Sequence, residues 1–160
     1  MKKKTLKNKF QWTPKHLGHE KGSRPIPPLK IDSRIPKLWI TSLPPLEKEL
    51  KTGKDLVTDT YLVNSSGIVL DSVIATTGGP ARGYAEDPEF LEAFHRSVEV
   101  IEYTNVANGE AVRIFEYERI YDSDWMLSIG FEVKMNDKLV KLNSSFSKVT
   151  KGFQEEALLY

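Results

Sequence analysis

Three histidines are the first place to look for chemistry in this chain of 160 residues. His16 and His19 stand three positions apart, a spacing that on a helix would let two imidazoles share a metal ion. Gly18 lies between them and Glu20 is the one nearby carboxylate, whereas a zinc site needs three or four ligands. His95 has no nucleophile that the sequence pairs with it. We therefore expect no metal ion and no other cofactor.

Two loop sequences share features with ligand-binding motifs. Asp122-Ser123-Asp124 has the side chains of a calcium loop but not the glycine and closing glutamate of the full motif, so it predicts a turn. The glycine-rich segment 78–83 contains Arg82, and such loops can expose backbone N–H groups to a phosphate. It lacks the Lys-Ser/Thr ending of a P-loop. We interpret this segment as a connection and keep Arg82 as a candidate partner-binding residue.

Carboxylates are the remaining candidates for catalysis. A facing pair of carboxylates is the catalytic set of most glycoside hydrolases. The simpler interpretation is the solvent face of a sheet, and the absence of cysteine excludes thiol nucleophiles, disulfides and cysteine-ligated zinc. A non-catalytic protein is therefore the prediction, and a carboxylate-based hydrolase acting on carbohydrate is an alternative. The carboxylates on predicted strands are Glu99, Glu102, Glu110, Glu116, Glu118 and Glu132.

The chain divides by charge near residue 54. Met1–Lys54 contains 14 Lys+Arg and 4 Asp+Glu, a net charge of +10. Asp55–Tyr160 contains 9 and 18, a net charge of −9, and the two parts sum to the +1 of the whole chain. A basic segment joined to an acidic body indicates that electrostatics guide an association, within the protein or with a partner.

Residues 1–36 are predicted to form an extended basic arm. The run Pro25-Ile26-Pro27-Pro28-Leu29-Lys30 favours a polyproline-like path and fits the pattern of polyproline ligands, although a stiff spacer is the simpler interpretation. Apolar side chains within the arm indicate that parts of it dock on something. The candidate partner-binding residues of the arm are Lys2, Lys3, Lys4, Lys7, Lys9, Phe10, Trp12, Pro25, Pro27 and Pro28.

Three hypotheses compete for the arm. It folds over the acidic sheet of its own chain, it inserts into a protein partner or a sister subunit, or it binds nucleic acid. Lysines suit phosphates and the aromatic pair Phe10 and Trp12 suits base stacking. Arginine is absent before Arg24, which argues against base-specific readout.

The body has β-strand patterns with turn signals between them. Lys37–Leu43 lies between Pro36 and Pro44, so it predicts a short edge strand. Asn64-Ser65-Ser66-Gly67 is a turn between two strands, and Asn108-Gly109 predicts a tight hairpin between Val98–Val106 and Ala111–Ile120. Trp125–Met135 alternates apolar and other residues at period two, which indicates a strand with one buried face.

One strand departs from simple alternation. In residues 112–118 the apolar positions change from even to odd between Ile114 and Phe115, which predicts a bulge or twist there. Phe115 and Tyr117 would then share the face of Arg113 and form an exposed aromatic pair, a candidate partner-binding patch of the body. The alternative is a sheet that is buried on both faces, with the arm as its second cover.

These patterns predict an all-β fold. Six or seven strands at regular spacing are typical of an antiparallel β-sandwich, immunoglobulin-like or similar, with one short helix at Pro88–Arg96. We expect the arm to span residues 1–36, the sandwich 37–149 and a C-terminal tail or short helix 150–160. The predicted core is Leu62, Ile68, Leu70, Val98, Val100, Val112, Ile114, Trp125, Leu127, Ile129, Phe131 and Val133.

The predicted function is a non-catalytic interaction or assembly module. Its acidic sandwich and basic arm would dock on a protein partner or form a homo-oligomer, and a nucleic-acid-associated protein that binds phosphates through the arm is an alternative. The Met-Lys-Lys-Lys start is not followed by an apolar stretch, so we expect no signal peptide and a cytoplasmic location. No stretch is apolar enough over roughly 20 residues to cross a bilayer.

Overall fold

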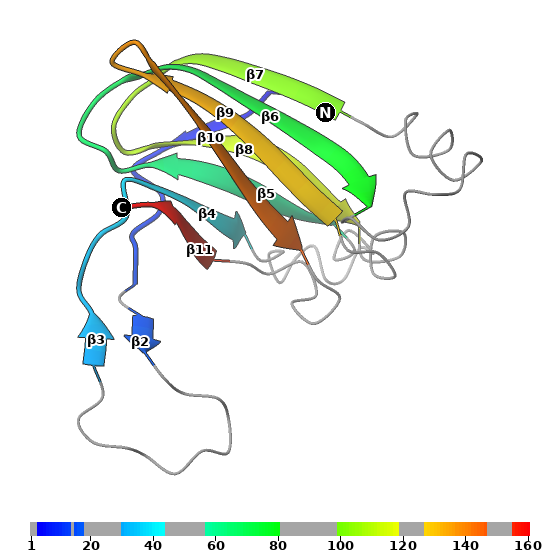
Figure 1. Cartoon of the computed structure of the whole chain (residues 1–160). Coiled ribbons are helices and arrows are strands. Elements are labelled where there is room, and N and C mark those ends of the chain that lie inside the picture. The colour runs from blue at the N-terminus through cyan, green and yellow to red at the C-terminus, as the bar shows by residue number, and fades with distance from the viewer. Residues whose placement is uncertain are drawn as a thin grey trace.

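A computed structural model of the chain describes residues 3–13, 15–17, 30–43, 57–80, 99–118, 127–146 and 155–160. Its two larger sheets are antiparallel and pack face to face as a sandwich, so the predicted all-β sandwich is confirmed (Figure 1). The described residues contain no helix, and so they include no helix that could cross a membrane. The helix predicted at Pro88–Arg96 lies outside the described residues.

The first sheet has five strands in the order β1-β8-β5-β4-β11. The prediction that Lys37–Leu43 forms an edge strand is wrong, because β4 pairs with β5 on one side and with β11 on the other. Pro36 precedes the strand, so its missing N–H removes no hydrogen bond from the ladder, and Pro44 lies outside the described residues. The strands are β1 (Thr5–Lys7), β4 (Leu38–Leu43), β5 (Val57–Asn64), β8 (Glu110–Glu118) and β11 (Glu155–Leu159).

This sheet extends beyond the predicted limits of the sandwich at residues 37 and 149. Strand β1 comes from the predicted arm, and strand β11 lies where a tail or short helix was expected. Glu155–Ala157 pair with Thr41, Ile40 and Trp39 of β4. Pairing with a neighbouring strand fixes the backbone of such short segments, which carry little periodic signal of their own.

The second sheet has four strands in the order β10-β9-β6-β7. Alternation in β9 is as predicted where it is described, because Ile129, Phe131 and Val133 are buried. The strands are β6 (Leu70–Pro80), β7 (Glu99–Val106), β9 (Leu127–Met135) and β10 (Lys138–Phe146). A separate ribbon of β2 (Lys15–Leu17) and β3 (Lys30–Asp32) extends away from the sandwich (Figure 1).

The tight turns gather at one end of the sandwich. Asn136 and Asp137, with φ of 49° and 59°, form a two-residue β9–β10 hairpin. The turn at Asn108-Gly109 also forms, but the predicted hairpin across it is wrong, because β7 and β8 belong to different sheets. Asn105, with a φ of 55°, breaks the extended backbone shortly before this turn, where the chain passes from one sheet to the other.

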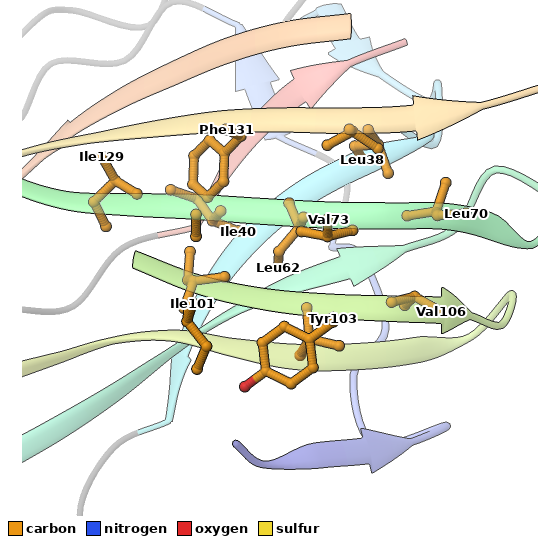
Figure 2. Close-up of a cluster of buried hydrophobic side chains, with 14 of the residues drawn as sticks. Leu38, Ile40, Leu62, Leu70, Val73, Ile101, Tyr103, Val106, Ile129 and Phe131 are labelled. Atoms are coloured by element: carbon orange, nitrogen blue, oxygen red, sulfur yellow. The ribbon is translucent and has the colours of Figure 1, made fainter. Parts of the chain in front are cut away.

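The main core fills the space between the two sheets (Figure 2). Of the predicted core residues, Leu62, Leu70, Val112, Ile114, Ile129, Phe131 and Val133 belong to it. Val100 does not, and is 61% exposed, because Ile101 and Tyr103 are the residues of β7 that point inward. Ile68 is half-buried, and Val98, Trp125 and the Leu127 side chain lie outside the described part.

A second cluster covers the outer face of the five-stranded sheet. Trp39, Tyr61, Val63 and Ala111 point to this face, and Trp12 packs on them from the N-terminal segment. The five-stranded sheet is therefore buried on both faces, as one of the two hypotheses for it predicts.

Phe131→Ala is expected to lower the free energy of unfolding by roughly 3–5 kcal/mol, because a fully buried aromatic ring leaves a cavity in a packed core. The matched substitution Val69→Ala, at a position that is 52% exposed, should change it by less than about 0.5 kcal/mol. Urea unfolding of both variants measures the difference, and equal effects would contradict the burial of Phe131.

Candidate functional site

The N-terminal segment, residues 3–13, enters the five-stranded sheet as an edge strand. Thr5–Lys7 pair antiparallel with Glu110–Val112, and the Arg113 N–H donates to the Lys4 carbonyl over 2.9 Å. Asn8 then adopts a φ of 49° and donates its N–H to the Gly109 carbonyl, also over 2.9 Å. Gly109 has a φ of 79°, which favours glycine, and a Cβ there would lie 2.5 Å from the Asn8 Oδ1, so the Asn8 side chain would have to move.

The Tyr103 hydroxyl bridges the N-terminal segment and β8 next to β1. Tyr103 lies on β7 of the opposite sheet, and its hydroxyl donates to the Arg113 carbonyl over 2.7 Å. The same oxygen accepts from the Lys4 N–H over 3.1 Å. The phenol thus links two backbone groups of different strands and ties β1 to both sheets.

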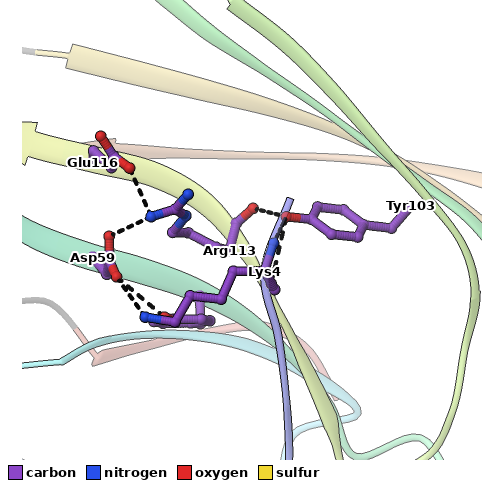
Figure 3. Close-up of polar contacts among 6 residues, drawn as sticks. Lys4, Asp59, Tyr103, Arg113 and Glu116 are labelled. Atoms are coloured by element: carbon purple, nitrogen blue, oxygen red, sulfur yellow. Dashed lines mark hydrogen bonds and ion pairs between the residues drawn. The ribbon is translucent and has the colours of Figure 1, made fainter. Parts of the chain in front are cut away.

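Asp59 of β5 is the centre of a charged network beside β1 (Figure 3). Its Oδ2 lies 3.2 Å from the Lys4 Nζ and accepts from the Tyr61 hydroxyl over 3.2 Å. Its Oδ1 lies 3.2 Å from the Arg113 Nη1, which also lies 2.6 Å from the Glu116 Oε1. Two cations and two carboxylates therefore balance one another. We call Lys4, Asp59, Tyr61, Tyr103, Arg113 and Glu116 the clasp.

The surroundings of the clasp favour the protonated forms of one lysine and two tyrosines. Hydrogen bonding to Tyr61 and then to Asp59 raises the pKa of Lys4 above its ordinary value of about 10.5. Burial is the main cause that raises the pKa of Tyr61 and of Tyr103 above about 10. All three groups therefore hold their protons more strongly in the folded protein than in the unfolded chain.

Aromatic contacts anchor the rest of the segment. The Phe10 ring lies 5.4 Å from the Tyr61 ring, and the Trp12 ring meets Trp39 edge-on at 5.3 Å between centroids. Such pairs add about 0.5–1.5 kcal/mol beyond the burial of their area. The Lys3 ammonium lies 5.8 Å from the centroid of the Tyr103 ring, within cation–π range.

The structure brings four of the predicted arm residues together on the sandwich. Lys3, Lys4, Phe10 and Trp12 contact it directly. Lys7 pairs with Glu110 through the backbone of β1 and its side chain is exposed, as is that of Lys9. Lys2, Pro25, Pro27, Pro28 and Arg82 lie outside the described residues, as do His19, His95 and the acidic turn at 122–124.

The predicted aromatic pair of the body is not exposed. Tyr117 is buried in the main core, and Phe115 packs against the same core. The predicted bulge is present, since Thr60 pairs with Phe115 and Tyr61 with Arg113, which leaves Ile114 as the extra residue. The extra residue shifts the inward and outward alternation of the strand by one position, so both rings point to the inner face like Ile114. The expectation that they share the face of Arg113 is therefore wrong.

Sequence reasoning did not find the centre of the clasp. Asp59 and Tyr103 are distant in sequence from Lys4, and no local motif joins them. The sequence predicts Glu116 only as a carboxylate on a strand. A charged residue at Arg113, between the apolar Val112 and Ile114 of a strand, was the one local signal of a polar contact on that face.

The clasp can hold a basic, extended segment against the edge of a sheet. Backbone pairing fixes its direction, Asp59 receives a cation, and the cluster around Trp39 and Tyr61 receives aromatic rings. Among the described residues, no three acidic or histidine side chains are grouped as metal ligands would be.

Comparisons with models of protein families, with curated proteins and with solved structures found no match to this chain.

Stability is expected to fall as the pH rises above about 10. The raised pKa values of Lys4, Tyr61 and Tyr103 mean that the folded state binds more protons than the unfolded state in that range. The contribution is complete below pH 10 and is lost as the pH passes through the folded pKa values. Urea unfolding between pH 8 and roughly pH 11 should show a shallower decline for Tyr103→Phe than for the wild type.

Tyr103→Phe should itself lower the free energy of unfolding by about 1–3 kcal/mol at neutral pH, because the Lys4 N–H and the Arg113 carbonyl lose the bridging hydroxyl. Tyr160→Phe, at a tyrosine that is 43% exposed, is the matched control. Parallel pH profiles for all three proteins would contradict the role given to Tyr103.

Proposed function

We propose that this protein is a non-catalytic interaction or assembly module. Its acidic β-sandwich and basic N-terminal arm dock on a protein partner or a sister subunit. The single observation that carries the proposal is the docking of residues 3–13. The free edge of β8 pairs with β1, a strand that comes from the N-terminal segment and not from the consecutive strands β4–β10 that form the sandwich. Addition of a strand to an open sheet edge is a common mode of protein recognition, in which backbone pairing gives affinity and side-chain sites give specificity.

The strand order supports an immunoglobulin-like fold in which one strand lies in the opposite sheet. Constant-type immunoglobulin domains place their first, second, fifth and fourth strands in one sheet and their third, sixth and seventh in the other. If β4 is counted as the first strand, the first, second and fifth are β4, β5 and β8, and the third, sixth and seventh are β6, β9 and β10. The fourth, β7, pairs with β6 instead of β8.

This exchange leaves a place beside β8, and β1 fills part of it. β1 pairs with three residues of β8, a strand that spans Glu110–Glu118. The sandwich therefore has an acceptor edge, and the clasp defines the ligand that suits it. That ligand is an extended segment with a cation near Asp59 and aromatic side chains some residues later, as in Lys4, Phe10 and Trp12.

The acceptor edge is expected to bind the segment in trans when the protein's own copy is weakened. A fluorescent peptide of residues 3–13 should bind full-length Trp12→Ala more tightly than the wild type, whose intact segment competes for the same site. Loss of a buried tryptophan anchor is worth on the order of 2 kcal/mol, or roughly 30-fold in the dissociation constant. Fluorescence anisotropy measures the binding.

A peptide with Lys4→Glu and Trp12→Ala together is the control and should not bind. If the natural peptide binds neither protein, the proposal that the edge of β8 accepts a strand in trans is wrong. A titration with a generic oligonucleotide across a range of salt concentrations tests the alternative. Binding that falls steeply with salt and needs the lysines of the arm would favour the nucleic-acid function instead. The lack of catalysis and the cytoplasmic location stay predictions.

A further inference from the structure

The two sheets differ in what covers their outer faces. The N-terminal segment covers the outer face of the five-stranded sheet, through Phe10 and Trp12. Most residues on the outer face of the four-stranded sheet are exposed to solvent, and Val100 and Leu139 are 61% and 56% exposed. We call this the open face. It consists of Ser72, Ile74, Thr76, Val100, Glu102, Thr104, Gly130, Glu132, Lys134, Leu139, Lys141 and Asn143.

Small residues occupy the centre of the open face. One cross-strand row runs from Asn143 through Gly130 and Thr76 to Val100. A Cβ added to Gly130 would meet nothing within 4 Å, so the inner packing of the sheet does not require glycine there. Glycine weakens the interior of a strand, and it often marks a place where another backbone approaches closely.

The next row carries charge of opposite sign at its two ends. It runs from Lys141 on β10 through Glu132 and Ile74 to Glu102 on β7. Lys141 is paired with Glu132 at 2.8 Å, whereas Glu102 is exposed at the far end of the row. Lys134 lies one row away on β9 and is paired with Asp137 at 3.8 Å, so β9 carries charges of both signs. The row that contains Glu132 therefore has its lysine at the β10 end and a second carboxylate, Glu102, at the β7 end.

We propose that the open face packs against the open face of a second copy of this chain, about a two-fold axis parallel to the strands. The proposal rests on the proposed function, since it names the sister subunit as the partner. This axis lays β10 over β7 of the second copy and β9 over its β6, within the same rows. Interfaces of this kind are isologous and must be self-complementary.

Two contacts of this arrangement satisfy that condition. Lys141 comes to lie over Glu102 of the second copy, and the symmetry repeats this pair. Gly130 comes to lie over Thr76 of the second copy, where two small residues permit the roughly 10 Å spacing of packed sheets. Asn143 covers the exposed Val100, and Glu132 lies over Ile74. A two-fold axis across the strands would instead lay β10 over β10 of the second copy, so Lys141 would no longer face Glu102.

Gly130→Arg tests the packing without disturbing the core, because the space beside Gly130 is open. Sedimentation velocity of the full-length wild type at micromolar concentration should give a dimer. Gly130→Arg should give a monomer with an unchanged far-ultraviolet circular dichroism spectrum, which shows that its sandwich is intact. Lys138→Glu changes the charge of β10 off the open face and should leave the dimer intact.

Charge reversal tests the orientation. Lys141→Glu and Glu102→Lys should each weaken the homodimer on the order of tenfold or more, because each places like charges opposite one another. A mixture of the two variants should form a heterodimer in native mass spectrometry, since both cross pairs are then opposite in sign.

A wild type that stays monomeric, a dimer that persists in Gly130→Arg, or a mixture that does not associate would each overturn the proposal. The peptide experiment on the acceptor edge does not depend on oligomeric state. A monomer that still binds the peptide would therefore end this inference and leave the proposed function standing.

Discussion

The structure depends on the burial of the five-stranded sheet on both faces. Trp39, Tyr61 and Val63 alternate with core residues such as Ile40 and Leu62, so one sheet carries two apolar surfaces. The opposite sheet covers one surface, and the N-terminal segment covers the other. Without that segment, large aromatic side chains would face water. The clasp follows from this requirement, because backbone pairing, the Asp59 ion pairs and the Tyr103 hydroxyl hold the segment in place.

This arrangement gives the charge division of the chain a physical meaning. The basic segment and the acidic body meet at Lys4 and Asp59, where the contact also contains Arg113 and Glu116. Exposed lysines such as Lys7 and Lys9 keep part of the positive charge in solvent. We infer that the same chemistry which docks the segment on its own sandwich specifies what a partner must offer. The open face of the other sheet differs from it, because small and polar residues lie there among charges of both signs.

Much of the fold could be predicted from the sequence, and the site could not. Period-two alternation in β9 and the turn residues at Asn64–Gly67 and Asn108-Gly109 are local signals, so they identified a strand and two turns correctly. The clasp joins residues far apart in sequence, and its members are ordinary strand residues until the sheets bring them together. The phase change at Ile114 was visible, but whether it turned Phe115 outward depended on the bulge geometry. Short strands such as β1 and β11 exist only through pairing.

The central claim is that residues 3–13 are a docked strand of the sandwich. Hydrogen-exchange mass spectrometry of the full-length protein at neutral pH tests it most directly. Leu6 pairs with Ala111, and the Asn8 N–H bonds to Gly109, so peptides that cover this segment should exchange slowly, within the range of the core strands. The segment should exchange faster in Asp59→Asn, while β9 and β6 stay protected. Exchange of residues 3–13 at the rate of an unfolded chain in the wild type would contradict the account.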